Sequence, residues 1–427
     1  MWLGVFLWAI LYLCLRMYFF YDILVYLTAF FLRIMAYFDP KIRQFVNGRK
    51  ATFKKISQVL HKEDKVIWMH CASLGEFEQG RPVIEALRNQ FPEKKIILSF
   101  FSPSGYEVRK NYTVADVVCY LPLDTQSNCR KFIDLVQPEL AIFVKYEFWP
   151  NMLRLLKRRA IKTLLISGIF RPEQAFFKWY GTFLKKSLKS FDRFFVQDSS
   201  SKDLLNKAGY QNVELSGDTR FDRVFAITDQ DNTLDFMTTF KNESYTVVAG
   251  STWKEDEALL ISYINKKSTA HEKFVLAPHN MDREAITTIK KSINKSTVLY
   301  TERKNYDLKN CQVLILDTIG ILTKVYSYAD LAYVGGGFTK SGVHNVLEPA
   351  TFGIPIVIGP NYYKFREVKD LVSLKACYSI DDSRKLSVIL SKFYEDQTFR
   401  TETGSLSLNY VLNQKGATKK IIKYIKR

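Results

Sequence analysis

The sequence has few cysteines and histidines, and neither set is arranged to bind a metal or to form a disulfide framework. Its 427 residues include six cysteines and five histidines. No two cysteines form a CxxC pair, so we expect reduced thiols, as in a cytosolic setting. The histidines lack the spacing of metal ligands, and no structural zinc is expected.

Acidic residues are scarce relative to basic ones. The 43 Asp and Glu residues face 62 Lys and Arg residues, which gives a net charge of +19. Such an excess suits an anionic membrane surface, nucleic acid or acidic substrates. The basic residues are scattered, and no basic motif interleaved with aromatics is present, so nucleic acid is the weaker alternative. A hydrophobic fraction of 47% excludes a disordered chain.

The first fifteen residues carry no charge, and the apolar pattern continues to Phe38. About 20 apolar residues are needed to cross a bilayer. The basic start and small-residue end of a signal peptide are both missing. We therefore predict an uncleaved membrane anchor over residues 1–40. Six basic residues between 41 and 55 place the downstream chain in the cytoplasm. Because Arg16 and Asp22 break the run, spanning the bilayer and lying in its interface both stay open.

Beyond the anchor, buried strands alternate with helical patterns. The apolar runs include 65–70, 95–101, 117–120, 140–144, 163–167 and 193–196, then 245–249, 274–277, 313–316, 331–334 and 354–358. Such alternation predicts parallel sheets with helices on both faces. The chain is too long for one core. We predict one doubly wound domain over 41–220, a polar link over 221–243, a second domain over 244–385 and C-terminal helices over 386–427. Ligands of such sheets bind beyond the carboxyl ends of the strands, in a cleft where the two domains face each other.

The most informative stretch runs from Tyr333 to Pro360. A short strand leads into three glycines, Gly335 to Gly337, and a polar loop follows. Asn345 is predicted to open a short helix that carries Glu348. Glycines let a ligand approach the backbone, a helix start favours phosphate, and a carboxylate one turn later can accept hydrogen bonds from a sugar diol. The stretch therefore predicts a site for a nucleotide.

In the first half, Glu76 directly follows a strand and the turn CASLG. Gly75 frees the backbone beside it, and a carboxylate at this strand end is placed to accept a proton from an attacking hydroxyl. Glu147 follows another strand at the same edge; a substrate contact and an exposed acid at a helix start are equally good interpretations. Lys145 is either a contact for an acidic substrate group or simply solvated.

In the second half, three further loops follow strands. GSTWKEDE begins at Gly250, and Ser251 or Thr252 is placed to cap the following helix. APHN from Ala277 and DTIG from Asp317 lie at strand ends on the same edge. Their convergence is a stronger signal than any one loop.

Taken in order, these motifs resemble a known family. They are ASLGEFEQGRPVIEAL from Ala72, KYEFWPN from Lys145, GSTWKEDE, DTIG, and HNVLEPATFGIPIVIGPNYYKFREV from His344. They are similar to the Kdo transferases of Gram-negative bacteria, which move 3-deoxy-D-manno-octulosonic acid (Kdo) from CMP-Kdo onto a lipid A precursor, lipid IVA. The resemblance implies a GT-B fold with an acceptor-binding and a nucleotide-sugar-binding domain. It also implies inverting transfer, no cofactor or bound metal, and N-terminal anchoring at the inner membrane with the domains on its cytoplasmic face.

The resemblance also assigns residues. Glu76 is expected to be the general base, with Ser73, Gly75, Lys145 and Glu147 on the substrate side. The expected donor contacts are Ser251, Thr252, His279, Asn280, Ile319, Gly320, Gly336, Gly337, Asn345 and Glu348. Leaving-group charge is expected to be stabilised by the helix near Asn345 and by the glycine loop.

Two loops depart from the family's pattern. Many members read Asp-Thr-Met-Gly-Glu where this chain has Ile321 in place of the acid, and many read Pro-Arg-His where this chain has Pro278-His279-Asn280. In these loops, the backbone N–H groups of Ile319 and Gly320 would then make the contacts with the cytidine and phosphate of the donor.

Two other functions fit parts of the sequence. A GT-B transferase that uses a UDP-sugar fits the two domains. A membrane-tethered protein that binds nucleotides or nucleic acid fits the charge.

Overall fold

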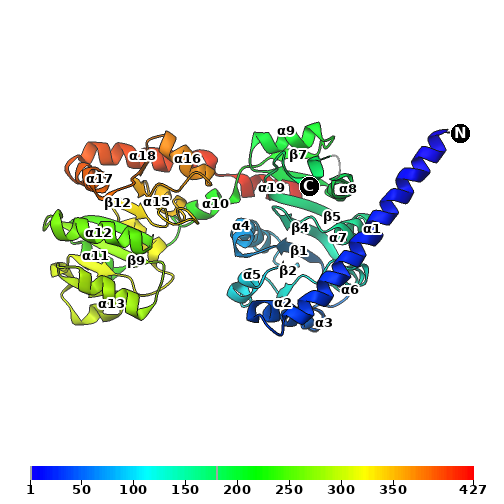
Figure 1. Ribbon diagram of the computed structural model, residues 1–427, viewed down its shortest axis with the longest axis horizontal. Coiled ribbons are helices and arrows are strands. Elements are labelled where there is room, and N and C mark those ends of the chain that lie inside the picture. The colour runs from blue at the N-terminus through cyan, green and yellow to red at the C-terminus, as the bar shows by residue number, and fades with distance from the viewer. Residues whose placement is uncertain (1, 179–180) are drawn as a thin grey trace. The chain divides into compact units, whose positions relative to one another are not determined.

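The chain folds into two units, each built on its own sheet. The computed structural model describes residues 2–178 and 181–427; side chains are described from residue 17 onward, except at 179, 180 and 182 (Figure 1). One unit comprises Met1–Asp222 and Gly416–Arg427, and the other comprises Arg223–Lys415.

The first unit contains a parallel sheet of seven strands in the order β3-β2-β1-β4-β5-β6-β7. The strands are β1 (Val66–Cys71), β2 (Lys95–Phe100), β3 (Val117–Tyr120), β4 (Pro138–Val144), β5 (Lys162–Gly168), β6 (Arg193–Val196) and β7 (Val213–Leu215). The chain starts at the inner strand β1, moves out to β3, and then returns to β4 on the other side of β1. The loops after β1 and β4 are therefore neighbours at the carboxyl edge, where doubly wound sheets bind ligands.

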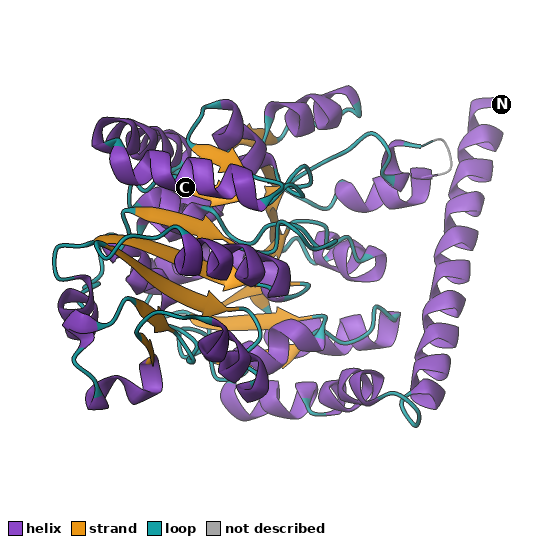
Figure 2. Cartoon of the chain, turned by 60° about the vertical axis from the view of Figure 1, so that its left-hand side comes forward, coloured by secondary structure: helices purple, strands orange, loops and turns teal. Residues whose placement is uncertain are grey.

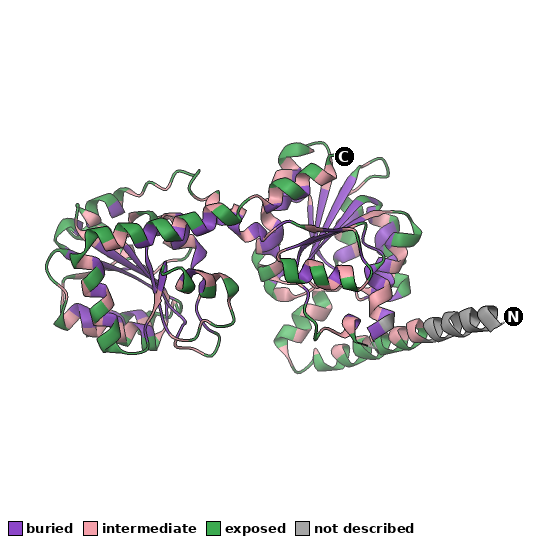
Figure 3. Ribbon diagram, turned by 90° about the horizontal axis from the view of Figure 1, so that it is seen from above, coloured by how far each residue is buried: buried purple, intermediate pink, exposed green. Residues whose placement is uncertain are grey.

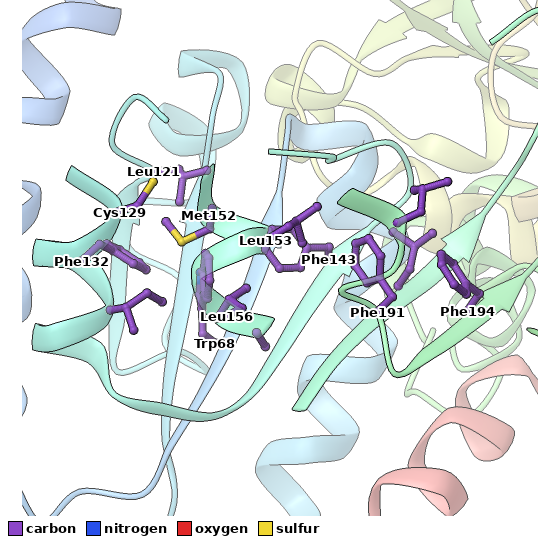
Figure 4. Packing of buried hydrophobic residues seen from close by; sticks show 14 of the residues in the cluster. Trp68, Leu121, Cys129, Phe132, Phe143, Met152, Leu153, Leu156, Phe191 and Phe194 are labelled. Atoms are coloured by element: carbon purple, nitrogen blue, oxygen red, sulfur yellow. The ribbon is translucent and has the colours of Figure 1, made fainter. Parts of the chain in front are cut away.

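Both faces of this sheet are covered by helices (Figure 2). They are α4 (Leu74–Gln90), α5 (Pro103–Arg109), α6 (Gln126–Val136), α7 (Pro150–Arg158), α8 (Thr182–Leu188) and α9 (Ser199–Lys207). Successive residues of β1 enter opposite cores: Trp68 packs with Phe132 and Phe143 on one face, and Met69 packs with Ile142 on the other. Figure 4 shows the first of these cores, in which aromatic rings fill the space between strands and helices. A strand buried on both faces reads as a continuous apolar run, which is why these strands were visible in the sequence.

Three helices precede the sheet: α1 (Trp2–Met35), α2 (Pro40–Lys50) and α3 (Thr52–Val59). Asp39 accepts a hydrogen bond from the N–H of Lys41 at 2.7 Å and so caps α2, with proline in its first turn. Within α1, Met17–Met35 is long and apolar enough to cross a membrane. The predicted apolar N-terminal helix is confirmed, and its role as an anchor stays a prediction.

The second unit contains a parallel sheet in the order β10-β11-β9-β8-β12-β13-β14. Its strands are β8 (Tyr245–Thr252), β9 (Glu272–Pro278), β10 (Thr297–Leu299), β11 (Val313–Ile315), β12 (Leu331–Val334), β13 (Ile356–Ile358) and β14 (Cys377–Ser379). Its main helices are α11 (Asp235–Lys241), α12 (Lys254–Lys266), α13 (Arg283–Ser292), α14 (Leu322–Val325), α15 (Leu347–Thr351), α16 (Arg366–Ser373), α17 (Ser383–Glu395) and α18 (Gln397–Gln414). Two doubly wound parallel sheets confirm the predicted α/β class.

Some predicted details differ. The helix expected to open at Asn345 begins two residues later, at Leu347, and has five residues. Val346 occupies the N-cap position, and the Asn345 side chain accepts a hydrogen bond from the N–H of Leu347 at 3.1 Å. Ser251 and Thr252 do not cap α12. They end strand β8, and Trp253 occupies the N-cap position.

The chain crosses back to the first unit at its end. Helix α10 (Thr219–Phe225) leads out of that unit, and α19 (Ala417–Ile425) returns to it. The carboxylate of Asp222 accepts hydrogen bonds from the N–H groups of Gly416 and Thr418, which joins the two crossings. Residues 386–427 were predicted as one set of C-terminal helices. The return of α19 to the first unit was not predicted.

The packing of α19 gives a stability prediction. Ile421 is fully buried against the first sheet's core, so we expect Ile421→Ala to destabilise the first unit by about 2–5 kcal/mol. Urea unfolding of the full chain measures this loss. Lys423→Ala, at an exposed position of the same helix, is the control and should leave the midpoint unchanged. An equal effect of both variants would contradict the packing of α19 in this core.

Candidate active site

The carboxylate of Glu76 lies in the first turn of α4, at the carboxyl end of β1. Ser73 at the N-cap donates a hydrogen bond from its hydroxyl to Glu76 Oε2. On the other side, Lys145 Nζ lies 3.7 Å from Glu76 Oε1. The Glu76 side chain keeps 17% of its surface exposed, so it is shielded and still reachable. A carboxylate in this setting is suited to accept a proton.

Lys145 reaches Glu76 from an unusual backbone conformation. Its φ is 70°, in the left-handed region that lysine rarely adopts, and its N–H donates to the carbonyl of Ile166 at 2.9 Å. Such strain persists only where surrounding structure enforces it, and it is concentrated at functional sites. Lys145 is therefore not simply solvated, because its ammonium group faces Glu76; a contact with an acidic substrate group stays a prediction.

Glu147 is held by a buried network. His70 Nε2 lies 2.9 Å from Glu147 Oε2, and the Trp149 indole donates to the same oxygen at 2.7 Å. His70 is fully buried, and its Nδ1 lies 2.9 Å from Ser99 Oγ. A carboxylate oxygen only accepts, so Nε2 of His70 carries a proton. Glu147 is therefore not an ordinary exposed acid at a helix start; its side chain is only 12% exposed.

In the second unit, Asp256 organises the loops after β8 and β12. It is completely buried and accepts hydrogen bonds from the N–H groups of Trp253 and Gly336, both at 2.9 Å, and from the hydroxyl of Tyr333 at 2.6 Å. Burial raises the pKa of this carboxyl, and the three donors act against that rise. One side chain thus ties two strand-end loops together.

The glycine run is required by packing inside this loop. A Cβ on Gly335 would lie 2.4 Å from the carbonyl oxygen of Ser251, and one on Gly337 would lie 2.6 Å from the N of Gly359. Gly336 adopts a φ of 89°. The N–H groups of Gly335 and Gly336 are engaged within the unit, so the glycines serve close approach between loops.

Three rings stack beside the glycines. His279 lies over Trp253 and over His344, with ring centroids 4.6 Å apart in each pair. The Trp253 indole also donates to His344 Nε2 at 3.0 Å, which requires that nitrogen to be unprotonated. The rings form one surface from three separate strand-end loops.

Asn345 and Glu348 form a second polar pair in this unit. Asn345 Nδ2 donates to Glu348 Oε1 at 3.0 Å, and Thr323 Oγ1 donates to Glu348 Oε2 at 2.7 Å. Arg223 is close enough to interact electrostatically with Glu348; burial lowers the pKa of this arginine, and Glu348 counteracts the shift. Stabilisation of leaving-group charge by the helix start near Asn345 stays a prediction.

The remaining predicted donor residues occupy different settings. Thr252 donates to Glu257 Oε1 at 3.1 Å, and Ser251 has a φ of 54°. Asn280 is exposed, Ile319 is 82% exposed, and Gly320 has a φ of 97°. Their contacts with a donor stay predictions. Among the residues whose placement is described, no group of three or more His, Cys, Asp or Glu side chains forms a possible metal site.

Comparison with known proteins supports the resemblance. A family model described as 3-deoxy-D-manno-octulosonic-acid transferase (kdotransferase) matches residues 47–223. The 3-deoxy-D-manno-octulosonic acid transferase of Haemophilus influenzae is 24% identical over 93% of this chain and 94% of its own length. The enzyme of the same name from Aquifex aeolicus is 27% identical over 72% of this chain and 79% of its own. The chain is thus similar to Kdo transferases along nearly its whole length. It is a glycosyltransferase.

A solved structure supports the fold independently. The UDP-GlcNAc 2-epimerase from Neisseria meningitidis aligns over 85% of this chain and all of its own, with a TM-score of 0.57 and 13% identity. At this identity the likeness shows the fold alone. With the two doubly wound sheets, it confirms the predicted GT-B class.

Sequence reasoning missed several residues of these networks. His70 ends the run KVIWMH, and a polar residue at the carboxyl end of a buried strand was the available signal. Trp253 and His344 lie inside two of the motifs that carry the resemblance, but neither was predicted as a site residue. Arg223 lay in the supposed linker, where no signal pointed to it.

The ring stack predicts a pH dependence. Burial lowers the pKa of His344 below its ordinary 6.5, and the neighbouring His279 has a smaller effect in the same direction. The folded state therefore binds fewer protons than the unfolded state below pH 6.5, and stability should fall as pH drops from 6.5 toward the lowered pKa. Thermal unfolding at pH 7.5 and 5.5 measures this loss, which His344→Gln should reduce. His271→Gln, at an exposed position, should keep the wild-type loss; if His344→Gln also keeps it, His344 is not its source.

Proposed function

We propose that the protein transfers Kdo from CMP-Kdo to a lipid A precursor, lipid IVA, with inversion at the anomeric carbon. The proposal places this reaction at the cytoplasmic face of the inner membrane. The observation that carries it is the Glu76 carboxylate, held by Ser73 and Lys145 at the carboxyl end of β1. The similarity to Kdo transferases supports the donor class, and the net charge of +19 suits a donor and an acceptor that are both anionic.

In the proposed step, Glu76 accepts the proton of an acceptor hydroxyl. The hydroxyl oxygen forms a bond to the anomeric carbon of Kdo, and the bond from that carbon to the CMP phosphate oxygen breaks. The electron pair leaves with CMP. One displacement inverts the configuration. Lys145 and the donors to Glu147 fix the two carboxylates before the acceptor binds, so little reorganisation is required during reaction.

On the donor side, Asn345 and Glu348 are proposed to bind the cytidine. Thr323 and Asn345 orient the Glu348 carboxylate, whose oxygens also suit the hydroxyls of a ribose. The backbone N–H groups of Ile319 and Gly320 are proposed to face the phosphate. No cofactor or bound metal is proposed.

Mass spectrometry of the product tests the whole proposal. Full-length protein incubated with CMP-Kdo and lipid IVA should yield lipid that carries added Kdo, and nuclear magnetic resonance should show inverted anomeric configuration. A UDP-sugar in place of CMP-Kdo is the control donor. Transfer from the UDP-sugar alone would show that the proposed donor is wrong.

Replacing Glu76 should remove the base. We expect Glu76→Ala to lower kcat by about 10²–10⁴-fold, the usual contribution of general base catalysis. Glu85→Gln, on the same helix and 40% exposed, is the matched control and should keep wild-type kcat. Near-normal transfer by a folded Glu76→Ala protein would exclude Glu76 as the base.

Removing the charge of Glu348 should weaken donor binding. Glu348→Gln keeps the side chain's shape but loses one acceptor and the negative charge, so we expect CMP affinity to fall about tenfold or more. Isothermal titration calorimetry with CMP measures it. The exposed Glu395→Gln serves as the control. If both variants bind CMP like wild type, Glu348 does not contact the nucleotide.

A further inference from the structure

Helix α1 has an inverted amphipathic pattern. Residues 17, 18, 21, 22, 25, 29, 32 and 36 are half-buried, and most of the others from 19 to 38 are exposed. Apart from Thr28 and Arg33, the exposed residues are aromatic or aliphatic; they comprise Phe19, Phe20, Ile23, Leu24, Tyr26, Leu27, Phe30, Phe31, Ile34, Met35, Tyr37 and Phe38. Figure 3 shows this part of the helix with mainly exposed and intermediate residues. An apolar stripe of this extent on the outside marks a membrane or protein contact surface.

The inward face of α1 is attached to the first unit by polar contacts. The Tyr21 hydroxyl donates to Asp124 Oδ2 at 2.8 Å, and the carboxylate of Asp22 accepts from the side-chain amides of Gln126 and Asn151. Arg154 lies over the ring of Tyr18 at 4.1 Å. Asp22, which seemed to interrupt a membrane span, is therefore a docking residue.

These contacts are at the functional edge of the sheet. Helices α6 and α7, which carry Gln126 and Asn151, begin just after the carboxyl ends of β3 and β4, and α1 passes beside them (Figure 1). Asn151, in the first turn of α7, is four residues from Glu147, which lies in the loop before that helix. The edge that holds Glu76 and Glu147 is thus fixed against α1.

These polar contacts between α1 and the first unit are incompatible with Met17–Met35 crossing a bilayer. A bilayer core is about 30 Å thick, so a crossing there would bring Asp22, Asp124 and Asn151 into hydrocarbon. Burying such groups in lipid is costly, and Asp124 is already needed to receive N–H groups of α7.

We propose that α1 from residue 17 to 35 lies along the membrane surface, with its apolar stripe in the boundary between headgroups and acyl chains. The inference rests on the proposed membrane location and adds the orientation of α1 relative to the bilayer. The partner is an anionic phospholipid surface, because the exposed cations Arg33, Lys41, Arg43 and Lys50 accompany the stripe. The first fifteen residues of the sequence carry no charge. The sheet edge with Glu76 is then held beside the bilayer.

Depth measurement separates lying from spanning. Phe20, Leu27 and Ile34 are on one face, seven residues or about 10 Å apart along the helix. In full-length protein with Cys14 replaced by Ser, each is changed singly to Cys and labelled with an environment-sensitive fluorophore; the other five cysteines are buried. The vesicles contain phosphatidylglycerol and lipids with quenchers at graded depths. No substrate is required, so failure of Kdo transfer leaves the result readable.

A lying helix should place the three labels at one shallow depth, equal within about one helical turn, 5 Å. Val25→Cys, on the inward face, is the matched control and should be quenched less than Leu27→Cys. A steady change in depth of about 20 Å from Phe20 to Ile34 would show a span and overturn the proposal. Absence of quenching at all three outward positions would overturn it as well.

Discussion

The hydrogen bond between His70 and Glu147 joins the inner strand β1 to the loop after β4. His70 is the next-to-last residue of β1, and Glu147 lies in that loop, so their 2.9 Å contact fixes the position of the loop against the sheet. Lys145 and Trp149 belong to the same loop, and through them the Glu76 carboxylate and the start of α7 are fixed too. Because His70 is fully buried and bonded at both ring nitrogens, this geometry is set before any ligand arrives.

The second unit uses a buried carboxylate in a comparable way. Asp256 receives hydrogen bonds from the loops after β8 and β12, while Gly335 lets the loop after β12 approach the end of β8 and Gly337 lets it approach the loop after β13. The surface made by Trp253, His279 and His344 depends on the approach at Gly335. Glycine is needed there for internal packing, and donor contacts of Gly336 and Gly337 stay predictions.

The fold class and the Glu76 position were predictable from sequence because they depend on local patterns. Strands buried on both faces appear as apolar runs, and a turn with an acid after such a strand marks the ligand edge. The side-chain networks were not predictable. His70 meets Glu147, and Trp253 meets His344, only because non-consecutive strands are neighbours in each sheet. The start of α15 was predicted two residues too early: Asn345 is a residue type that favours helix starts, and its side chain does accept from the N–H of Leu347, but Val346 occupies the N-cap position.

Helix α1 shows where hydropathy alone misleads. A window of apolar residues with few charges describes both a span and a helix with one apolar face outward, and composition does not separate them. The contacts of Tyr21 and Asp22 do, because polar bonds to the first unit on one side leave only the other side for lipid. For the proposed lipid acceptor, the orientation of α1 also decides how far its headgroup must leave the bilayer to reach the Glu76 carboxylate at the same edge of the unit. A helix lying in the surface shortens that distance, and a helix crossing the bilayer would not constrain it.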